Sequence, residues 1–210
     1  MRRLSLTALL SLPLLTLACD DASKGAPASA EPSQAASAAV KGPDDSKDSA
    51  EGKPQGTAEA PSGLLAVGAD APKVETVAHD GEPVSLEKLR GRPVVVYFYP
   101  KDDTKGCTLE AEQIRDKHED LSKLGVVLGV SSDSNESHVE FAKKYSLPFK
   151  LLPDTDQAIA NAFGVPVTRG YAKRVTFIID KDGKVAKVFP DVAPDGHAEE
   201  IYAELKKLAG

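Results

Sequence analysis

Residues 94–99 read Val-Val-Val-Tyr-Phe-Tyr, an unbroken apolar run of β-branched and aromatic side chains. Such a run is typical of a strand that is buried on both faces in the centre of a parallel sheet. Residues 126–130, Val-Val-Leu-Gly-Val, form a second run of this kind, and residues 108–124 between them have a helical pattern. The apolar side chains that can share one face of this helix are Leu109, Ile114, Leu121 and Leu124. The sequence therefore predicts a strand–helix–strand unit with a right-handed crossover.

The segments on either side of this unit complete the expected fold. Asp-Gly pairs at residues 80–81 and 182–183 each lie between short apolar runs, a pattern that is typical of β-hairpins. Further helical patterns begin near residues 133–134 and near residues 194–195, and Asp156 is predicted to cap a short helix that runs through Phe163. A βαβ unit that is followed by an antiparallel pair and a helix is the thioredoxin-like arrangement. We therefore expect an α/β fold with a mixed central sheet that is flanked by helices.

The composition of the 210-residue chain excludes several classes of function. Lys and Arg total 26 against 32 Asp and Glu, a net charge of −6, whereas proteins that bind nucleic acid or anionic lipid carry a basic excess. The aromatic residues are too few for a single-strand stacking platform, with five Tyr, six Phe and no Trp. Two cysteines exclude a disulfide-rich scaffold and a four-cysteine zinc site. The four histidines lack metal-pair spacing, so we expect them to be structural or solvated and expect no metal or other cofactor.

The first 18 residues have the layout of a signal peptide. Arg2 and Arg3 precede an apolar run at residues 4–18, which at about 15 residues is shorter than the roughly 20 that a membrane-spanning helix needs. The run ends Leu-Thr-Leu-Ala-Cys, which resembles the lipobox of bacterial lipoproteins, in which the cysteine is lipidated. Thr16 is a departure, because Leu is usual at that position. We expect an exported protein that is anchored through Cys19 to a bacterial membrane and faces the periplasm.

Residues 19–63 form a low-complexity segment of mainly Ala, Ser, Pro, Gly and charged residues. Such a segment buries too little apolar surface to offset the loss of chain entropy, so we expect a disordered linker. It is either a spacer between a membrane and the domain at residues 64–210 or a dispensable tail. Two alternatives for the leader remain open, an ordinary signal that is cleaved after residues 28–30 and twin-arginine export, which the flanking residues fit poorly.

Residues 99–110, Tyr-Pro-Lys-Asp-Asp-Thr-Lys-Gly-Cys-Thr-Leu-Glu, lie where the central strand ends and a helix begins. In α/β sheets, functional sites form at this position. Cys107 falls at or just inside the helix N-terminus, where unpaired N–H groups favour an anion, and the thiolate is the nucleophilic form of cysteine. The alternative is that Cys107 is a small buried apolar residue. The charged residues of this stretch, Lys101, Asp102, Asp103 and Lys105, are predicted to form a solvated rim.

Residues 94–116 resemble the active-site segment of the peroxiredoxins, and most of all that of the bacterioferritin comigratory protein (PrxQ) subfamily. The similarity extends from about residue 65 to residue 208, includes Arg174, and leaves residues 1–63 outside it. The family pattern is Pro-x-x-x-Thr-x-x-Cys-x-x-Glu. In this chain it is met by Pro100, Thr104, Cys107 and Glu110.

This resemblance implies a thiol-dependent peroxidase that reduces hydrogen peroxide and organic hydroperoxides in antioxidant defence. Cys107 would attack the peroxide and become a sulfenic acid, while Arg174 would stabilise the thiolate and hold the peroxide. Thr104 would bond the thiolate or the substrate, and Pro100 would screen the pocket from water. Glu110 would anchor the arginine from behind. The alternatives are a surface charge at Arg174, a turn residue at Thr104, a strand stop at Pro100 and a solvated carboxylate at Glu110.

One departure from the family pattern bears on the mechanism. Many members of the subfamily carry a resolving cysteine five residues after the reactive one, where this chain has Glu112, and residues 64–210 contain no other cysteine. We therefore expect a one-Cys enzyme whose sulfenic acid is reduced by an external thiol, such as a thioredoxin-like protein or a small thiol. Two other functions remain open. A thiol–disulfide oxidoreductase needs Cys-x-x-Cys, which Thr104 breaks, whereas a redox sensor or tethered binding module shares the first chemical step.

Overall fold

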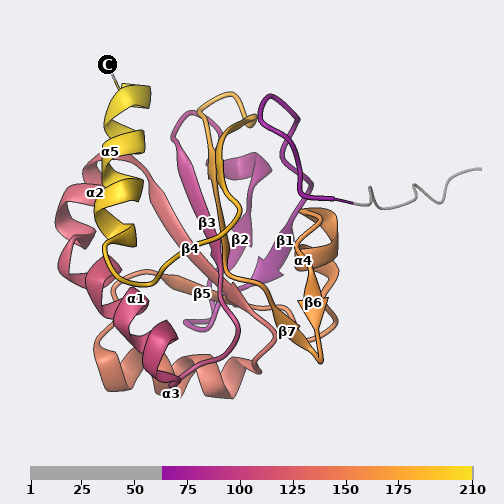
Figure 1. The fold of residues 1–210 in the computed structure, drawn as a ribbon, viewed down its shortest axis with the longest axis vertical. Coiled ribbons are helices and arrows are strands. Elements are labelled where there is room, and N and C mark those ends of the chain that lie inside the picture. Colours follow the sequence, from indigo (N-terminus) through magenta and orange to yellow (C-terminus); the bar gives the residue numbers. More distant parts are fainter. Residues whose placement is uncertain (1–62, 210) are drawn as a thin grey trace, which may run out of the picture. The chain divides into compact units, whose positions relative to one another are not determined.

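The computed structural model describes residues 63–209, which contain a five-stranded mixed sheet (Figure 1). The expected signal peptide, Cys19 and residues 19–62 of the expected linker lie outside the described residues. The strands of the sheet, in spatial order, are β5 (Lys150–Pro153), β4 (Val126–Ser131), β3 (Val94–Phe98), β8 (Val175–Ile179) and β9 (Val185–Phe189). The strands β3, β4 and β5 are parallel, whereas β8 and β9 run antiparallel to their neighbours. This confirms the predicted α/β fold with a mixed central sheet.

Strand β3 is the centre of the sheet, and every residue in it is buried. Side chains alternate between the two faces of a strand, so Val95 and Tyr97 contribute to one apolar cluster and Val94, Val96 and Phe98 contribute to the other. The apolar run therefore folds as predicted because both of its faces are covered.

The two faces of the sheet are covered by different elements. The cluster around Val95 and Tyr97 includes side chains from four helices, α1 (Lys105–Asp116), α2 (His118–Leu124), α3 (Asn135–Tyr145) and α5 (His197–Ala209). The opposite cluster includes side chains from the hairpin of β1 (Glu75–Val77) and β2 (Pro83–Ser85), from the 3-10 helix η1 (Glu87–Leu89), from α4 (Ala158–Ala162) and from the small hairpin of β6 (Val167–Thr168) and β7 (Tyr171–Ala172). None of the helices in residues 63–209 has the length and apolar character that a membrane crossing requires.

The predicted helix at residues 108–124 is wrong in two details. The chain forms two helices, α1 and α2, that are separated at Lys117, whose N–H bonds back to the carbonyl of Gln113. Leu109, expected on the buried face, is 40% exposed, whereas Ile114 is fully buried. Five helical residues turn through about 140° beyond one full circle, so these two side chains cannot face the sheet together.

Other departures are at the ends of elements. Asp156 was predicted to cap the short helix α4, but the N-cap is the next residue, Gln157, and the helix begins at Ala158. The Asp156 carboxylate still accepts the N–H of Ala158 at 3.1 Å, and that of Asp154 accepts the N–H groups of Ile159 and Ala160 at 2.8 Å. Strand β5 was absent from the predicted order. It has only four residues and ends in a proline, so its strand pattern is short and weak. Both predicted Asp-Gly hairpins are present.

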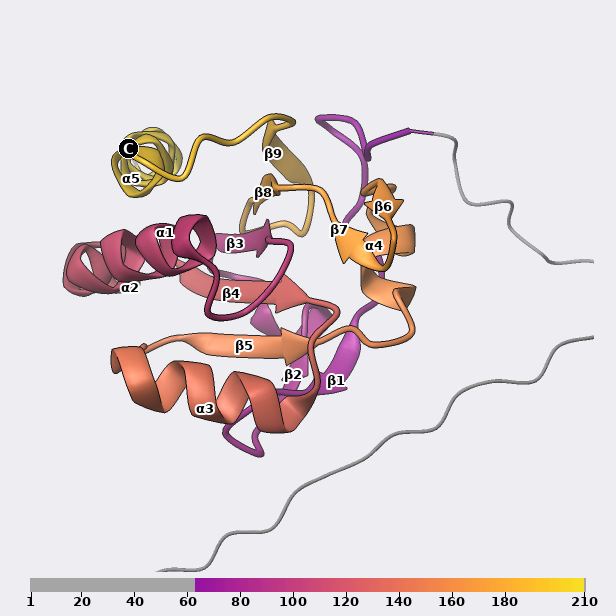
Figure 2. The same cartoon turned by 60° about the horizontal axis from the view of Figure 1, so that its bottom comes forward.

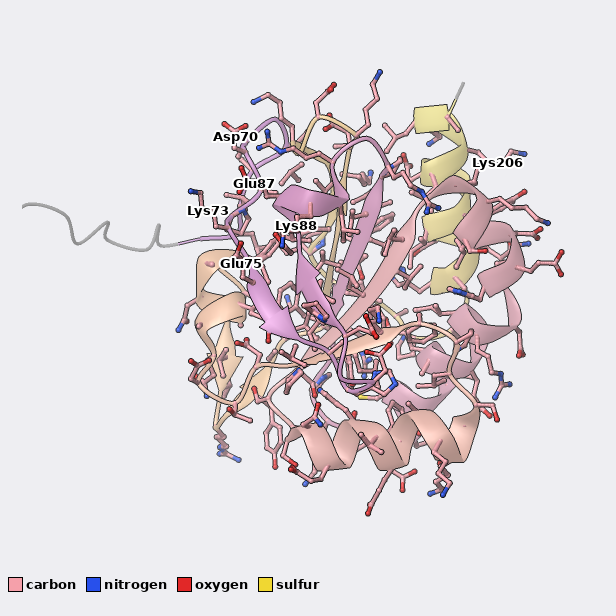
Figure 3. All side chains as sticks on the ribbon, turned by 180° about the vertical axis from the view of Figure 1, so that it is seen from behind. Asp70, Lys73, Glu75, Glu87, Lys88 and Lys206 are labelled. Atoms are coloured by element: carbon pink, nitrogen blue, oxygen red, sulfur yellow. The ribbon has the colours of Figure 1, made fainter. Side chains whose placement is uncertain are left out.

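The rear surface of the domain carries charges of both signs. Figure 3 labels exposed side chains of this kind around β1 and η1, namely Asp70, Lys73, Glu75, Glu87 and Lys88. This part of the described surface is therefore not a continuous basic patch.

Candidate active site

Cys107 is the third residue of α1, directly after the loop that leaves β3 (Figure 2). Thr104 is the N-cap of this helix and has an extended backbone, with φ −89° and ψ 148°. The N–H groups of a helix's first turn have no acceptor within the helix, so they give its start a partial positive charge. Cys107 is only 2% exposed. Its sulfur is therefore buried and lies at the positively polarised start of α1.

Arg174 reaches this sulfur from the strand that neighbours β3. It directly precedes β8, and the pairing of Val175 with Phe98 places it beside the end of β3. The Arg174 Nη2 donates a hydrogen bond to Cys107 Sγ at 3.3 Å. Burial acts to lower the pKa of Arg174, but the neighbouring Glu110 and Cys107 raise it overall, so its guanidinium stays charged. The structure thus places a fixed cation against the candidate nucleophile.

Glu110 lies one helical turn after Cys107, on the same face of α1. It is buried, and its Oε2 accepts a hydrogen bond from Arg174 Nη1. Its Oε1 has no partner among the described residues. Burial raises the pKa of Glu110 to about 7, against the opposing effect of Arg174. The Glu110 carboxyl is therefore buried against the Arg174 guanidinium and does not face solvent.

Neither Thr104 nor Pro100 makes a hydrogen bond to the Cys107 sulfur among the described residues. The Thr104 side chain is exposed, and its hydroxyl donates to the carbonyl of Lys101 at 3.0 Å. Pro100 is half-buried and directly follows Tyr99 at the end of the central strand. Among the residues predicted for the site, hydrogen bonds therefore join Cys107, Arg174 and Glu110, whereas Thr104 bonds to its own loop.

Gly106 keeps space open beside the reactive pair. A Cβ atom at this position would lie 3.4 Å from Arg174 Nη2 and 3.5 Å from Pro194 Cγ. Gly106 thus lies beside the guanidinium of Arg174 and in the first turn of α1, whose N–H groups have no acceptor within the helix. Such donors stabilise negative charge that develops on a departing oxygen. The arrangement can therefore activate a thiolate and hold the oxygen that leaves.

The prediction of a solvated charged rim is wrong for one of its members. Asp102 is 6% exposed, and its carboxylate accepts hydrogen bonds from Tyr99, Ser137 and His138. Its partners on α3 are 35 and 36 residues away in sequence, so the pattern of the loop alone gave no sign of its burial. Within residues 63–209, no group of three His, Cys, Asp or Glu side chains is arranged to hold a metal ion.

The comparisons with known proteins agree with this geometry. The sequence model of the AhpC/TSA family matches residues 67–188. The chain is 44% identical over 149 residues to a putative peroxiredoxin bcp of Coxiella burnetii. The aligned region covers 67% of this chain and 99% of that protein. It is 40% identical over 153 residues to peroxiredoxin Bcp of Bacillus subtilis, covering 69% of this chain and 98% of that protein.

Two solved structures have the same fold. Peroxidoxin BcpB of Mycobacterium tuberculosis has a TM-score of 0.63 at 32% identity, covering 68% of this chain and 97% of that one. Peroxiredoxin Q of Xanthomonas campestris has a TM-score of 0.62 at 33% identity, covering 65% of this chain and 92% of that one. The family match, the identity to Bcp relatives and the thioredoxin-like peroxiredoxin fold all concern the part of the chain that carries Cys107 and Arg174. The chain belongs to the AhpC/TSA family, within its Bcp/PrxQ peroxiredoxins.

Proposed function

We propose that this protein is a one-Cys, thiol-dependent peroxidase that reduces hydrogen peroxide and organic hydroperoxides in antioxidant defence. The observation that carries the proposal is the buried Cys107 Sγ at an α-helix N-terminus, 3.3 Å from Arg174 Nη2. The partial positive charge of the helix start and the guanidinium both stabilise the negative charge that develops during peroxide cleavage. Membership of the peroxiredoxins supports the same chemistry.

The first half-reaction uses Cys107 as nucleophile. Its thiolate sulfur forms a bond to one peroxide oxygen as the O–O bond breaks, and the departing oxygen takes a proton to leave as water or an alcohol. The sulfur is oxidised to a sulfenic acid. Arg174 holds the peroxide and the departing oxygen, and Glu110 fixes the direction of the arginine through Nη1.

The second half-reaction needs a thiol from outside the domain. The only other cysteine of the chain is Cys19, and α1 carries Glu112 five residues after Cys107. An external thiol sulfur attacks Cys107 Sγ, which forms a mixed disulfide and releases the sulfenic oxygen as water. A second thiol then attacks the mixed disulfide and restores the Cys107 thiol. The external thiol is a thioredoxin-like protein or a small thiol.

Peroxide consumption tests this proposal. The protein with Cys19→Ser keeps Cys107 as its only thiol, and we expect fast loss of one equivalent of peroxide and then sustained turnover with thioredoxin or a small dithiol. The Cys107→Ser variant is the matched control and should consume none. Fast loss of one equivalent that then stops under every thiol would support the redox-sensor alternative. Absence of a fast first turnover would overturn the proposal.

We further propose that the protein is exported and anchored by a lipid on Cys19. Its support is the charged start, the short apolar run and the Leu-Thr-Leu-Ala-Cys ending of residues 1–19. The intact mass of protein extracted from membranes tests this. Loss of residues 1–18 with added acyl mass is the expected result, whereas an unmodified chain that begins after Ala30 would contradict it.

A further inference from the structure

The charged residues that follow the central strand differ in their pairing. Lys101, Asp102 and Asp103 lie in the loop between β3 and α1, and Lys105 is the first residue of α1. The Asp102 side chain is buried, and the Asp103 carboxylate pairs with Lys144 Nζ at 2.6 Å. Lys101 and Lys105 are exposed, and neither forms an ion pair with a carboxylate of residues 63–209. This stretch therefore presents a net positive charge to solvent.

The hairpin of β6 and β7 continues this positive surface. Lys101 Nζ lies 5.8 Å from the centre of the Tyr171 ring, so the loop and the hairpin are side by side. Arg169 is exposed in the turn of the hairpin and also has no ion-pair partner within the described part of the chain. The hairpin leads directly into Arg174. Lys101, Lys105 and Arg169 are called the cationic rim below.

The carboxylates that follow β9 do not neutralise the cationic rim. Asp191 pairs with Lys173 at 3.6 Å. Asp195 accepts a hydrogen bond from Gln113 Nε2 at 2.7 Å, and Gln113 lies about 9 Å further along α1 than Cys107. The whole chain has a net charge of −6. The positive charge is therefore a local feature of the surface around the site in a protein that is acidic overall.

The reacting sulfur is recessed beneath this surface. Cys107 is 2% exposed, and the Arg174 side chain beside it is 15% exposed. A small molecule can enter such a recess, whereas a protein has to bring its thiol in on a broad surface. Hydroperoxides are uncharged at neutral pH, so fixed cations do not attract them by charge. A thiol attacks as the negative thiolate, so the cationic rim acts on the second half-reaction.

We propose that the cationic rim selects a small thiol that carries carboxylate groups as the reductant of the Cys107 sulfenic acid. This inference rests on the proposed function and names the class of its external thiol. Fixed positive charges beside a site raise the local concentration of an anion and speed its encounter with the site. A carboxylate near the thiol sulfur adds to the charge of the thiolate and strengthens this attraction.

The cationic rim forms no bond in the reaction. The external thiolate sulfur forms a bond to Cys107 Sγ, the S–O bond of the sulfenic acid breaks, and the released oxygen takes a proton to leave as water. A second molecule of the thiol attacks the mixed disulfide and restores the Cys107 thiol. Lys101 and Lys105 therefore change how often the anion arrives and leave the bond-making step to the two sulfurs.

The double variant Lys101→Gln, Lys105→Gln removes two charges from the cationic rim. Arg169 is left in place because its φ of +55° lies in the left-handed region, where a substitution can disturb the turn. The matched control is the double variant Lys88→Gln, Lys206→Gln. These two exposed lysines are on η1 and in the last turn of α5, and both are labelled in Figure 3. The control changes the net charge of the protein by the same amount.

Three small thiols of different charge provide the readout. All proteins carry Cys19→Ser and are first oxidised by one equivalent of hydrogen peroxide. The attacking thiolates of 3-mercaptopropionate, 2-mercaptoethanol and cysteamine have charges of −2, −1 and 0. Quenched-flow mass spectrometry gives the rate of sulfenic acid reduction by each one. At low salt we expect the variant of the cationic rim to slow these reactions by about 10-fold, about 3-fold and not at all. In about 1 M salt, where charges are screened beyond about 3 Å, the differences should disappear.

The graded response to thiol charge is the diagnostic result. The control variant should keep all three rates, and oxidation of Cys107 by uncharged hydrogen peroxide should stay within about 2-fold in every protein. Equal slowing of the three thiols, or no slowing, would overturn the proposal. If reduction by thioredoxin slows in the variant while that by 3-mercaptopropionate does not, a protein thiol is the partner and the proposal is also wrong. If the protein with an intact rim fails to lose one equivalent of peroxide, the proposed function is what has failed.

Discussion

Arg174 donates one hydrogen bond to Cys107 Sγ and another to Glu110 Oε2, although it is more than 60 residues away from both in the sequence. The two bonds come from different nitrogens of one planar guanidinium. The Cys107 sulfur and the Glu110 carboxyl therefore both fix its orientation, which a lysine ammonium cannot reproduce.

Substitution of Arg174 should remove most of the peroxide reactivity. We expect Arg174→Lys to slow the oxidation of Cys107 by about 100-fold and Arg174→Met by more, because a positioned donor to developing negative charge contributes a factor of this size. Single-turnover oxidation measures the effect. Lys173→Met, an exposed neighbour, is the control and should keep the original rate. If Cys107 of the Arg174→Lys variant were oxidised as fast as that of the original protein, the paired contacts of the guanidinium with Cys107 and Glu110 would not be needed.

Glu110 should make stability depend on pH. Burial raises its pKa to about 7 in the folded protein, against 4.5 for an ordinary glutamate. Because the folded protein holds this proton more tightly, the group favours folding fully below pH of about 4.5, and that contribution is lost as the pH rises to about 7. The loss should be on the order of 3 kcal/mol in the free energy of unfolding.

Urea unfolding between pH 4.5 and 7.5 measures this contribution as a difference from Glu110→Gln. The stability of the variant should fall less over the window than that of the original protein. Glu112→Gln, on the same helix but half-exposed, should follow the original protein. Parallel curves for the original protein and Glu110→Gln would contradict the raised pKa.

His197 should have the opposite pH dependence. Burial lowers its pKa, although the adjacent Glu200 carboxylate acts to raise it, and its Nε2 contacts Thr176 Oγ1 at 2.8 Å. An unfolded histidine gains a proton near pH 6.5 while the folded one resists it, so the stabilisation is present above that pH and is lost as the pH falls. The melting temperature should therefore drop less between pH 7.5 and 5.5 in His197→Gln. An equal drop in both proteins would disprove this role.

The two large apolar residues of α1, Leu109 and Ile114, provide a matched pair for stability. Ile114 is fully buried under the sheet, and Leu109 on the same helix is 40% exposed. Ile114→Ala should cost about 2–5 kcal/mol in the free energy of unfolding, as expected where a cavity forms in the core. Leu109→Ala should cost less than about 1 kcal/mol. Chemical unfolding compares them directly, and equal losses would mean that the helix presents a different face.

The sequence predicted the elements whose patterns are local. The apolar run at residues 94–99 needs no distant partner to be recognised as a buried strand, and the two Asp-Gly turns fix their hairpins within a few residues. The placement of Cys107 at a helix start followed from the same local pattern. Strand β5 was missed because four residues with a terminal proline give too little pattern.

Contacts between segments that are distant in the sequence could not be predicted from local patterns. Asp102 and Asp103 are adjacent and alike in the sequence, yet one is buried against His138 and the other pairs with an exposed lysine. The positions of α3 and of Tyr99 separate the two environments. The choice between a buried and a solvated Glu110 depends in the same way on Arg174, which arrives from another strand.

Strand pairing has a consequence for the chemistry. Antiparallel pairing of Val175 with Phe98 sets where Arg174 stands relative to Cys107. A shift of β8 by one residue would turn the arginine to the opposite face of the sheet. One residue inserted between Arg174 and Val175, with the pairing of β8 retained, is therefore expected to abolish peroxide reactivity with every reacting side chain still present. The same insertion in the turn at residues 181–183, beside the start of β3, would leave that distance unchanged. The hydrogen-bond register between β3 and β8 thus sets the distance between the Arg174 guanidinium and the Cys107 sulfur.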